Sequence, residues 1–316
     1  MSPDEWLAVI GSEYLATYVR EGGAAVKFAA ASTDAGRAAL RGRLAAAAEA
    51  HGFQVARLDA SEVRLHLIDR LFHAVARQVD WDGLARAYVE RLLRARGLRL
   101  PPAPEPLAAA RLAELNAAPE LLLRAELRRT LEHEVFEDYA MSREFRLAML
   151  HLCAAQLDPT DNPALEAAIK AWLRGELRLL SEVKRALIFQ KIARHNARHM
   201  LLSLAHWLTL TGKSGLLLVL DVARYAEAVR PAERGAGNYY SPSATMDLYE
   251  LLRQLIDATD EAQACFVGVL VGPDFLQDDR RGVRSYQALY FRIWDEVYDR
   301  NRENPFSSLV RIAGAA

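Results

Sequence analysis

The sequence predicts an α/β protein with a parallel five-stranded sheet and a large, mainly helical insertion between the second and third strands. Three observations lead to this expectation. Five short apolar segments have the length and composition of buried strands. Helical segments fill every gap between them, as right-handed crossovers between parallel strands require. Residues 62–212 follow the helical period almost without interruption, which places the insertion.

The first two strands are expected close to the N-terminus. They span Ala25–Ala30 and Phe53–Asp59, and an Ala/Arg-rich helix from Gly36 to about His51 separates them. This is a strand–helix–strand unit of the kind from which parallel sheets are built.

The helical insertion begins with an apolar stripe between Leu65 and Val79. A stiff Pro-rich connector at residues 101–106 interrupts the helical pattern. A second break follows at residues 158–163, where Asp161 or Asn162 is suited to cap the next helix.

The α/β pattern returns after residue 212. In order, the expected elements are a strand at Gly215–Asp221, a helix from about Ala244 to Thr259, a strand at Ala264–Val271, a helix from about Ser285 to Arg300 and a strand at Ser308–Ile312. The predicted organisation is therefore residues 1–61 and 213–316 for the two parts of the α/β domain, and residues 62–212 for the insertion.

The junction between the first strand and its helix has the setting of a phosphate-binding loop, G-x-x-x-x-G-K-[ST]. Aligned on Gly36, the first glycine of the pattern is Ala31, the lysine is Arg37 and the Ser/Thr is Ala38. A planar guanidinium does not fit the cradle of a compact ammonium, and a methyl group cannot bind Mg²⁺. Asp34 adds a negative charge where phosphates would lie. The sequence thus predicts a degenerate Walker A motif.

The third strand matches the other half of such a site. Its apolar run ends at Asp221, the position of a Walker B aspartate that holds Mg²⁺. The glutamate that usually follows to activate water is replaced by Val222. Val271 at the end of the fourth strand stands where a polar residue often senses the γ-phosphate. Neither a catalytic residue nor a metal is therefore expected, and ATP with Mg²⁺ is not an expected cofactor.

These features resemble the P-loop ATPases of BREX-type phage-defence systems, a branch of the AAA+ superfamily. The resemblance covers roughly two-thirds of the chain. It is carried by residues 18–28, 51–59, 194–200, 255–260 and 279–286. It implies a P-loop fold and work in a multi-protein assembly acting on DNA. It does not imply activity, because the residues that carry activity in the family are those that differ here.

The resemblance also suggests an interface. AAA+ proteins carry a helical lid after the fifth strand, and this chain stops there, so no C-terminal lid is expected. In AAA+ rings an arginine near the last helix reaches the neighbour's nucleotide, and Arg281, Arg284, Arg300 and Arg302 are candidates here. The plain alternative is surface arginine, because 35 of the 40 basic residues are Arg.

Other features are less specific. A net charge of −1 excludes a global attraction to nucleic acid or membrane. Two distant cysteines and the lack of a signal peptide or membrane-length apolar run indicate a cytoplasmic protein. His195, His199 and His206 share a helix face that favours solvent or a partner over a metal. Tyr239-Tyr240 could stack on bases or contact protein.

The leading hypothesis is a catalytically inactive subunit that serves as a structural or regulatory partner in a DNA-linked anti-phage complex. Its expected partners are other defence-complex proteins, above all an active ATPase relative, in a hetero-oligomer with indirect or weak DNA contact and no membrane contact. One alternative is a weak ATPase or nucleotide-binding switch that uses Arg37 and Asp221. A second is a DNA-binding adaptor whose helical insertion contacts the duplex.

Overall fold

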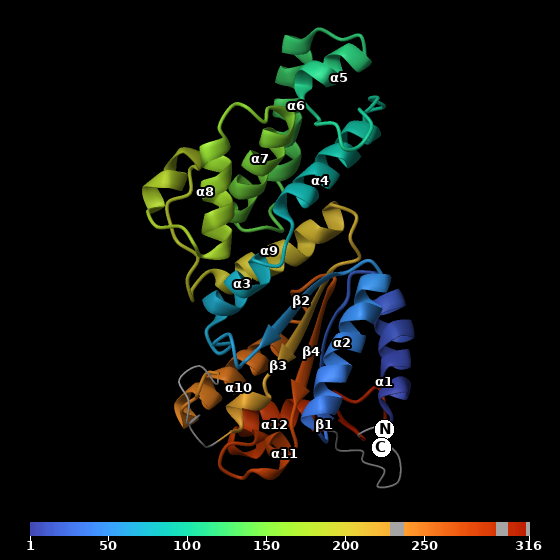
Figure 1. The fold of residues 1–316 in the computed structure, drawn as a ribbon, viewed down its shortest axis with the longest axis vertical. Helices are drawn as coiled ribbons and strands as arrows, with labels where there is room; N and C mark the ends of the chain where they lie inside the picture. Colours follow the sequence, from blue (N-terminus) through green and yellow to red (C-terminus); the bar gives the residue numbers. More distant parts are fainter. Residues whose placement is uncertain (228–236, 295–302, 314–316) are drawn as a thin grey trace. The chain divides into compact units, whose positions relative to one another are not determined.

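A computed structural model describes residues 1–227, 237–294 and 303–313 (Figure 1). The chain divides into two compact units. The sheet unit comprises Met1–Gln78 and Lys213–Ala316, and the helical unit comprises Val79–Gly212.

The sheet unit contains five strands, all parallel, in the order β2-β3-β4-β1-β5. This confirms the predicted fold class, and the strand bounds agree with the expected ones to within one or two residues. The strands are β1 Ala24–Ala31, β2 Gln54–Asp59, β3 Leu216–Asp221, β4 Cys265–Val271 and β5 Leu309–Ile312.

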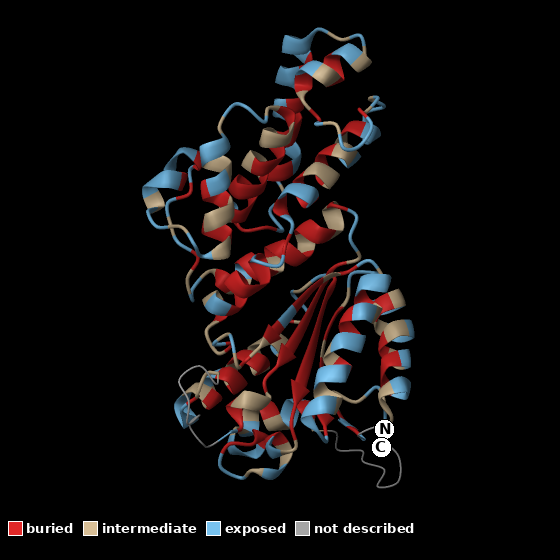
Figure 2. Ribbon diagram, in the orientation of Figure 1, coloured by how far each residue is buried: buried red, intermediate tan, exposed pale blue. Residues whose placement is uncertain are grey.

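The central strands β3 and β4 are buried along their whole length, which explains their continuous apolar sequences (Figure 2). Gly215 has a φ of +140°, and a Cβ there would come within 2.1 Å of the carbonyl oxygen of Ala264. In the register of β2 and β3, Asp59 lies opposite Asp221. Two carboxylates therefore lie side by side at the carboxyl edge of the sheet.

The segments that connect the strands contain helices, which pack on the sheet. Trp6, Ile10, Leu40 and Leu44 are among the buried side chains that pack with the strands into one core cluster. The helices of the sheet unit are α1 Pro3–Val9, η1 Ile10–Tyr18, α2 Asp34–Ala50, α3 Ile68–Ala76, η3 Ala223–Tyr225, α10 Pro242–Asp257, α11 Asp274–Gln277, η4 Val283–Ser285 and α12 Gln287–Ile293. The predicted last helix extends to Arg300, and its end lies outside the described residues.

The helical unit has its own core, with Trp81, Phe145, Trp172 and Trp207 fully or almost fully buried. Asn162 caps α8, because its Oδ1 accepts the amide of Leu165 at 3.2 Å. The elements of the unit are α4 Trp81–Ala95, α5 Ala109–Leu115, α6 Glu120–Phe136, α7 Arg143–Leu157, α8 Pro163–Arg174, η2 Leu180–Ala186 and α9 Ala197–Leu210. None of the helices that the structure describes is long and apolar enough to cross a membrane.

The boundary between the units falls later than the sequence analysis placed it. Helix α3 contacts β2, and the Gln78 side chain accepts the amide of Arg57 at 2.9 Å and donates to its carbonyl at 3.0 Å. Residues 62–78 therefore belong to the sheet unit, although their helical period resembles that of the residues after them. Periodicity indicates a helix but not the surface on which the helix packs.

Candidate functional site

The turn from β1 to α2 is too short to form a phosphate-binding arch. Strand β1 ends at Ala31 and helix α2 begins at Asp34, so only Ser32 and Thr33 connect them. Thr33 caps the helix: its hydroxyl accepts the Gly36 amide at 3.1 Å, and its carbonyl accepts the Arg37 amide at 2.9 Å. A P-loop presents successive free amides to phosphate. Here the Gly36 and Arg37 amides are bonded within the protein.

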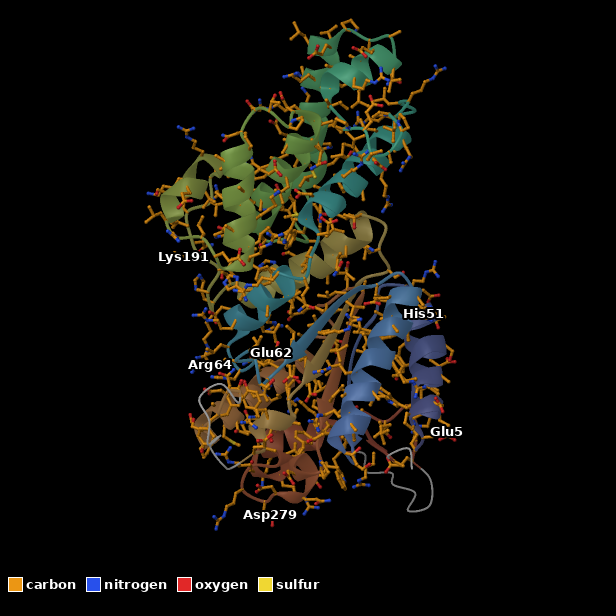
Figure 3. All side chains as sticks on the ribbon, in the orientation of Figure 1. Glu5, His51, Glu62, Arg64, Lys191 and Asp279 are labelled. Atoms are coloured by element: carbon orange, nitrogen blue, oxygen red, sulfur yellow. The ribbon has the colours of Figure 1, made fainter. Side chains whose placement is uncertain are left out.

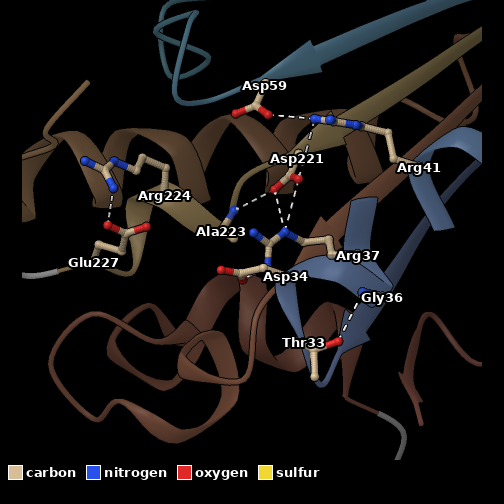
Figure 4. A network of polar contacts seen from close by, with 10 residues as sticks. All are labelled: Thr33, Asp34, Gly36, Arg37, Arg41, Asp59, Asp221, Ala223, Arg224 and Glu227. Atoms are coloured by element: carbon tan, nitrogen blue, oxygen red, sulfur yellow. Dashed lines mark hydrogen bonds and ion pairs between the residues drawn. The ribbon is translucent and has the colours of Figure 1, made fainter. Parts of the chain in front are cut away.

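Arg37, at the position of the Walker A lysine, is bound to the Walker B aspartate (Figure 4). Its Nε donates to both carboxylate oxygens of Asp221, at 3.0 and 3.1 Å. Its Nη1 donates to Asp34 at 2.8 Å. Only 14 % of the Arg37 side chain and 9 % of the Asp221 side chain are exposed. A mostly buried cation therefore lies at the centre of the predicted site and is neutralised there.

A second arginine extends this ion-pair cluster. Arg41 lies one helical turn beyond Arg37 and donates to Asp59 at 2.6 Å. The same Nη1 lies 3.8 Å from Asp221. The amide of Ser61 donates to the other oxygen of Asp59 at 2.8 Å. Both carboxylates at the ends of β2 and β3 thus have cationic partners from one face of α2.

The pKa directions agree with this pairing. Burial alone would lower the pKa of Arg37, but Asp221 and Asp34 outweigh it and raise the pKa above its ordinary value. For Asp59, burial alone would raise the pKa. Hydrogen bonds from Ser61 and the nearby Arg41 lower it by more, so the pKa lies below its ordinary value. Arg37 and Asp59 are therefore charged at neutral pH.

The residues at this edge do not fit Mg²⁺ with a nucleotide in the P-loop manner. Magnesium requires oxygen ligands in near-octahedral geometry, but the guanidinium of Arg37 binds both oxygens of Asp221. Ala38 offers no hydroxyl. Val222 is 3 % exposed, and its amide donates to Leu270. Gly272, after β4, faces the Arg37 guanidinium, since a Cβ built there would lie 3.7 Å from Nη1.

The four arginines predicted to serve a neighbouring subunit have different surroundings. Arg281 is 6 % exposed and donates to the carbonyls of Tyr225, Glu227 and Tyr240 at 2.8–3.3 Å. Its Nη2 donates to the hydroxyl of Tyr239 at 3.0 Å. A guanidinium held in this way is inaccessible to another protein. Arg284 is exposed, while Arg300 and Arg302 lie outside the described residues.

Two other expectations change with the structure. Tyr240 is 2 % exposed and stacks on Tyr225 with ring centroids 3.7 Å apart, so it cannot stack on a base as the sequence analysis considered. The three histidines were expected on one helix face turned to solvent or a partner, but His195 precedes α9 and His206, with 19 % of its side chain exposed, contacts Asp138 at 2.8 Å. Arg41 was missed as a site residue. Its position at i+4 from Arg37, on the same helix face, was the available signal.

A five-stranded parallel sheet with aligned Walker A and Walker B positions defines the P-loop NTPase-like class of α/β proteins. The chain belongs to the family of BREX system ATP-binding proteins BrxC/D, whose family model matches residues 13–314. No curated protein and no solved structure shows significant similarity to it. The BREX resemblance stated from the sequence is thereby confirmed.

Proposed function

We propose that this protein is a non-hydrolysing member of its family that acts as a structural or regulatory partner in the BREX phage-defence system. The observation that carries the proposal is the ion pair between Arg37 and Asp221. In a working P-loop ATPase these two positions contact the phosphates and Mg²⁺. Here they bind each other.

The ion pair opposes nucleotide binding, because it must be opened before Mg²⁺ and phosphate can bind. Magnesium must remove the guanidinium from Asp221 before it can bind there. The interaction between two groups in contact is about 1–3 kcal/mol. Because 1.4 kcal/mol is tenfold in affinity, losing it weakens binding by about fivefold to about a hundredfold. The short turn and the bonded Gly36 amide give little phosphate contact in return.

The protein then acts through protein contacts. Its near-neutral net charge gives no long-range attraction to DNA, so DNA contact is indirect or weak. The proposed partner is a catalytically intact member of the same family. Of the four candidate arginines, Arg284 is the described residue whose exposure supports a contact role, and Arg281 is withdrawn because it is buried.

The test has two parts. Purified alone, the protein should release no phosphate from ATP above background in the presence of Mg²⁺. With an active family member, Arg284→Glu should weaken the complex and lower the partner's ATPase rate. Arg20→Glu, another exposed arginine of the sheet unit, is the control for charge reversal. Hydrolysis by the wild type that Asp221→Asn abolishes overturns the inactivity. Equal binding by the two variants overturns the Arg284 contact.

A reversion experiment separates altered residues from an altered backbone. The variant Ala31→Gly, Arg37→Lys, Ala38→Ser, Val222→Glu restores the pattern residues. It should remain inactive, because β1 and α2 leave a two-residue turn and a glutamate at position 222 enters a buried site. A turnover rate of about 1 s⁻¹ or more would confine the defect to those four side chains.

A further inference from the structure

The segment between α8 and α9 has a charge unlike that of the rest of the chain. Seven of the 40 basic residues and only two of the 41 acidic residues lie between Arg174 and Arg198. The whole protein has a net charge of −1, so the remainder of the chain is acidic. The basic strip is defined here as the five exposed cations of this segment: Arg178, Lys184, Arg185, Lys191 and Arg194.

The backbone of the strip is held in place by the core of the helical unit. Val183, Ala186 and Ile188 are fully buried, and Ile192 is nearly so. Residues between these anchors point outward, and Lys191 is labelled at the surface in Figure 3. The indole of buried Trp172 donates to the carbonyl of Gln190 at 3.0 Å. The strip is therefore a pre-organised surface.

Further bonds fix the C-terminal part of the strip. The amide of Ala193 donates to Asn196 Oδ1 at 2.8 Å, and Asn196 Nδ2 donates to the carbonyl of Lys191 at 3.2 Å. Binding to such a segment requires little additional ordering of the backbone, which favours affinity.

None of the five strip cations has a carboxylate within ion-pair distance among the residues that the structure describes. The one acidic residue between them, Glu182, accepts the amide of Leu179 at 3.1 Å. Elsewhere in the same unit arginines are paired: Arg124 with Glu120 and Asp158, and Arg128 with Glu132. The strip therefore concentrates exposed positive charge that the fold itself does not neutralise.

We propose that the basic strip binds the sugar–phosphate backbone of a nucleic acid. The five exposed cations have no carboxylate partner among the described residues, and each Lys or Arg can neutralise one phosphate. Phe189, 57 % exposed within the strip, adds an aromatic face suited to a base or sugar. The strip lies entirely in the helical unit, so this inference is independent of the nucleotide site; it adds a direct, salt-sensitive contact to the weak DNA association proposed above.

The experiment measures fluorescence anisotropy of labelled duplex DNA, single-stranded DNA and RNA of mixed sequence with the full chain. If all five cations contact phosphates of duplex DNA, affinity should fall about 500-fold between 50 and 200 mM salt. The variant Lys184→Gln, Arg185→Gln, Lys191→Gln should bind more weakly and reduce the log–log salt slope by about 2.7. Unchanged thermal unfolding of the variant establishes that these exposed substitutions leave the fold intact.

The matched control removes the same charge at exposed arginines of the helical unit outside the strip: Arg99→Gln, Arg129→Gln, Arg143→Gln. It should bind within about twofold of the wild type and keep the salt slope. Equal weakening by the two triple variants overturns the proposal, because the effect is then one of net charge. Binding to none of the three nucleic acids at 50 mM salt also overturns it, as does binding only to vesicles of anionic phospholipid.

Discussion

Two groups of basic side chains, one in each unit, are used in opposite ways. In the sheet unit, Arg37 and Arg281 are mostly buried and bound to groups of the same protein. In the helical unit, the basic strip carries exposed cations without described carboxylate partners. A side chain's place in a motif therefore does not determine whether it is accessible to a ligand. Arg37, at the position of the Walker A lysine, and Arg281 are engaged internally, whereas the five strip cations, which lie outside any motif, are exposed.

The physical difference is desolvation. A buried guanidinium must have its donors satisfied and its charge balanced, since otherwise burial costs several kcal/mol. Arg37 meets both conditions with carboxylates, whereas Arg281 satisfies its donors with carbonyls and the hydroxyl of Tyr239 and interacts electrostatically with Asp278. An exposed lysine or arginine is hydrated by water and contributes little to folding until a partner arrives. Substitutions of Arg37 and Arg281 should therefore affect stability, and substitutions of the strip cations should affect binding.

The largest effect on stability is expected from Arg281→Met. The substitution leaves the carbonyl of Tyr240 without its donor and removes one of the two donors to the carbonyl of Tyr225, the other being the Thr245 hydroxyl, so the free energy of unfolding should fall by about 3 kcal/mol. The adjacent Arg280→Met, at an exposed position, should change it by less than about 0.5 kcal/mol. Urea unfolding of both variants measures the difference. Comparable losses would contradict a special role for the Arg281 contacts.

A smaller effect is expected from the Arg37–Asp221 pair. Arg37→Met and Asp221→Asn should be non-additive, with a coupling of about 1–3 kcal/mol in a double-mutant cycle. The control cycle uses Arg57 and Glu49, a pair whose side chains are about half exposed. That pair should couple by less than about 1 kcal/mol. Equal couplings would mean that burial of the first pair adds nothing.

The smallest effect is a dependence of stability on pH at α10. Arg253 lowers the pKa of Glu250 to about 2, assisted by Tyr286 and Gln254 and opposed by burial. A carboxylate with a depressed folded pKa stabilises above its unfolded pKa, ordinarily 4.5, and loses that contribution as pH falls toward 2. Glu250→Gln should thus cost more at about pH 5 than at about pH 3 in urea midpoints. A constant cost over that interval would contradict the assignment.

The sheet was predictable because its central strands are buried on both faces. Runs such as Leu216–Asp221 are apolar without alternation, and helical patterns fill every gap. The degenerate P-loop positions were also readable, since each change removes a named chemical group. The apolar pattern does not indicate which strands lie next to each other in the sheet. The order β2-β3-β4-β1-β5 sets Asp59 beside Asp221, and only then can Arg41 and Arg37 pair with them.

The wrong expectations for Arg281 and Tyr240 also arise from packing between distant segments. Arg281 reads as a surface arginine in an Arg-rich chain, and its burial depends on the carbonyls of Tyr225, Glu227 and Tyr240, which come from other segments. Tyr240 reads as a loop aromatic, yet its ring stacks on Tyr225. Local sequence gives the chemistry of a side chain. Long-range packing decides whether that chemistry faces solvent.

The central claim is that Arg37 holds the Walker B aspartate and thereby prevents nucleotide binding. Thermal unfolding with millimolar ATP and Mg²⁺ tests it directly, with Arg284→Glu as a control outside the site. Ligand binding stabilises by RT ln(1 + [L]/Kd), about 2.7 kcal/mol at a hundredfold excess over Kd. The account predicts no Mg²⁺-dependent rise in the unfolding temperature of the wild type. A clear rise that Asp221→Asn abolishes would contradict it.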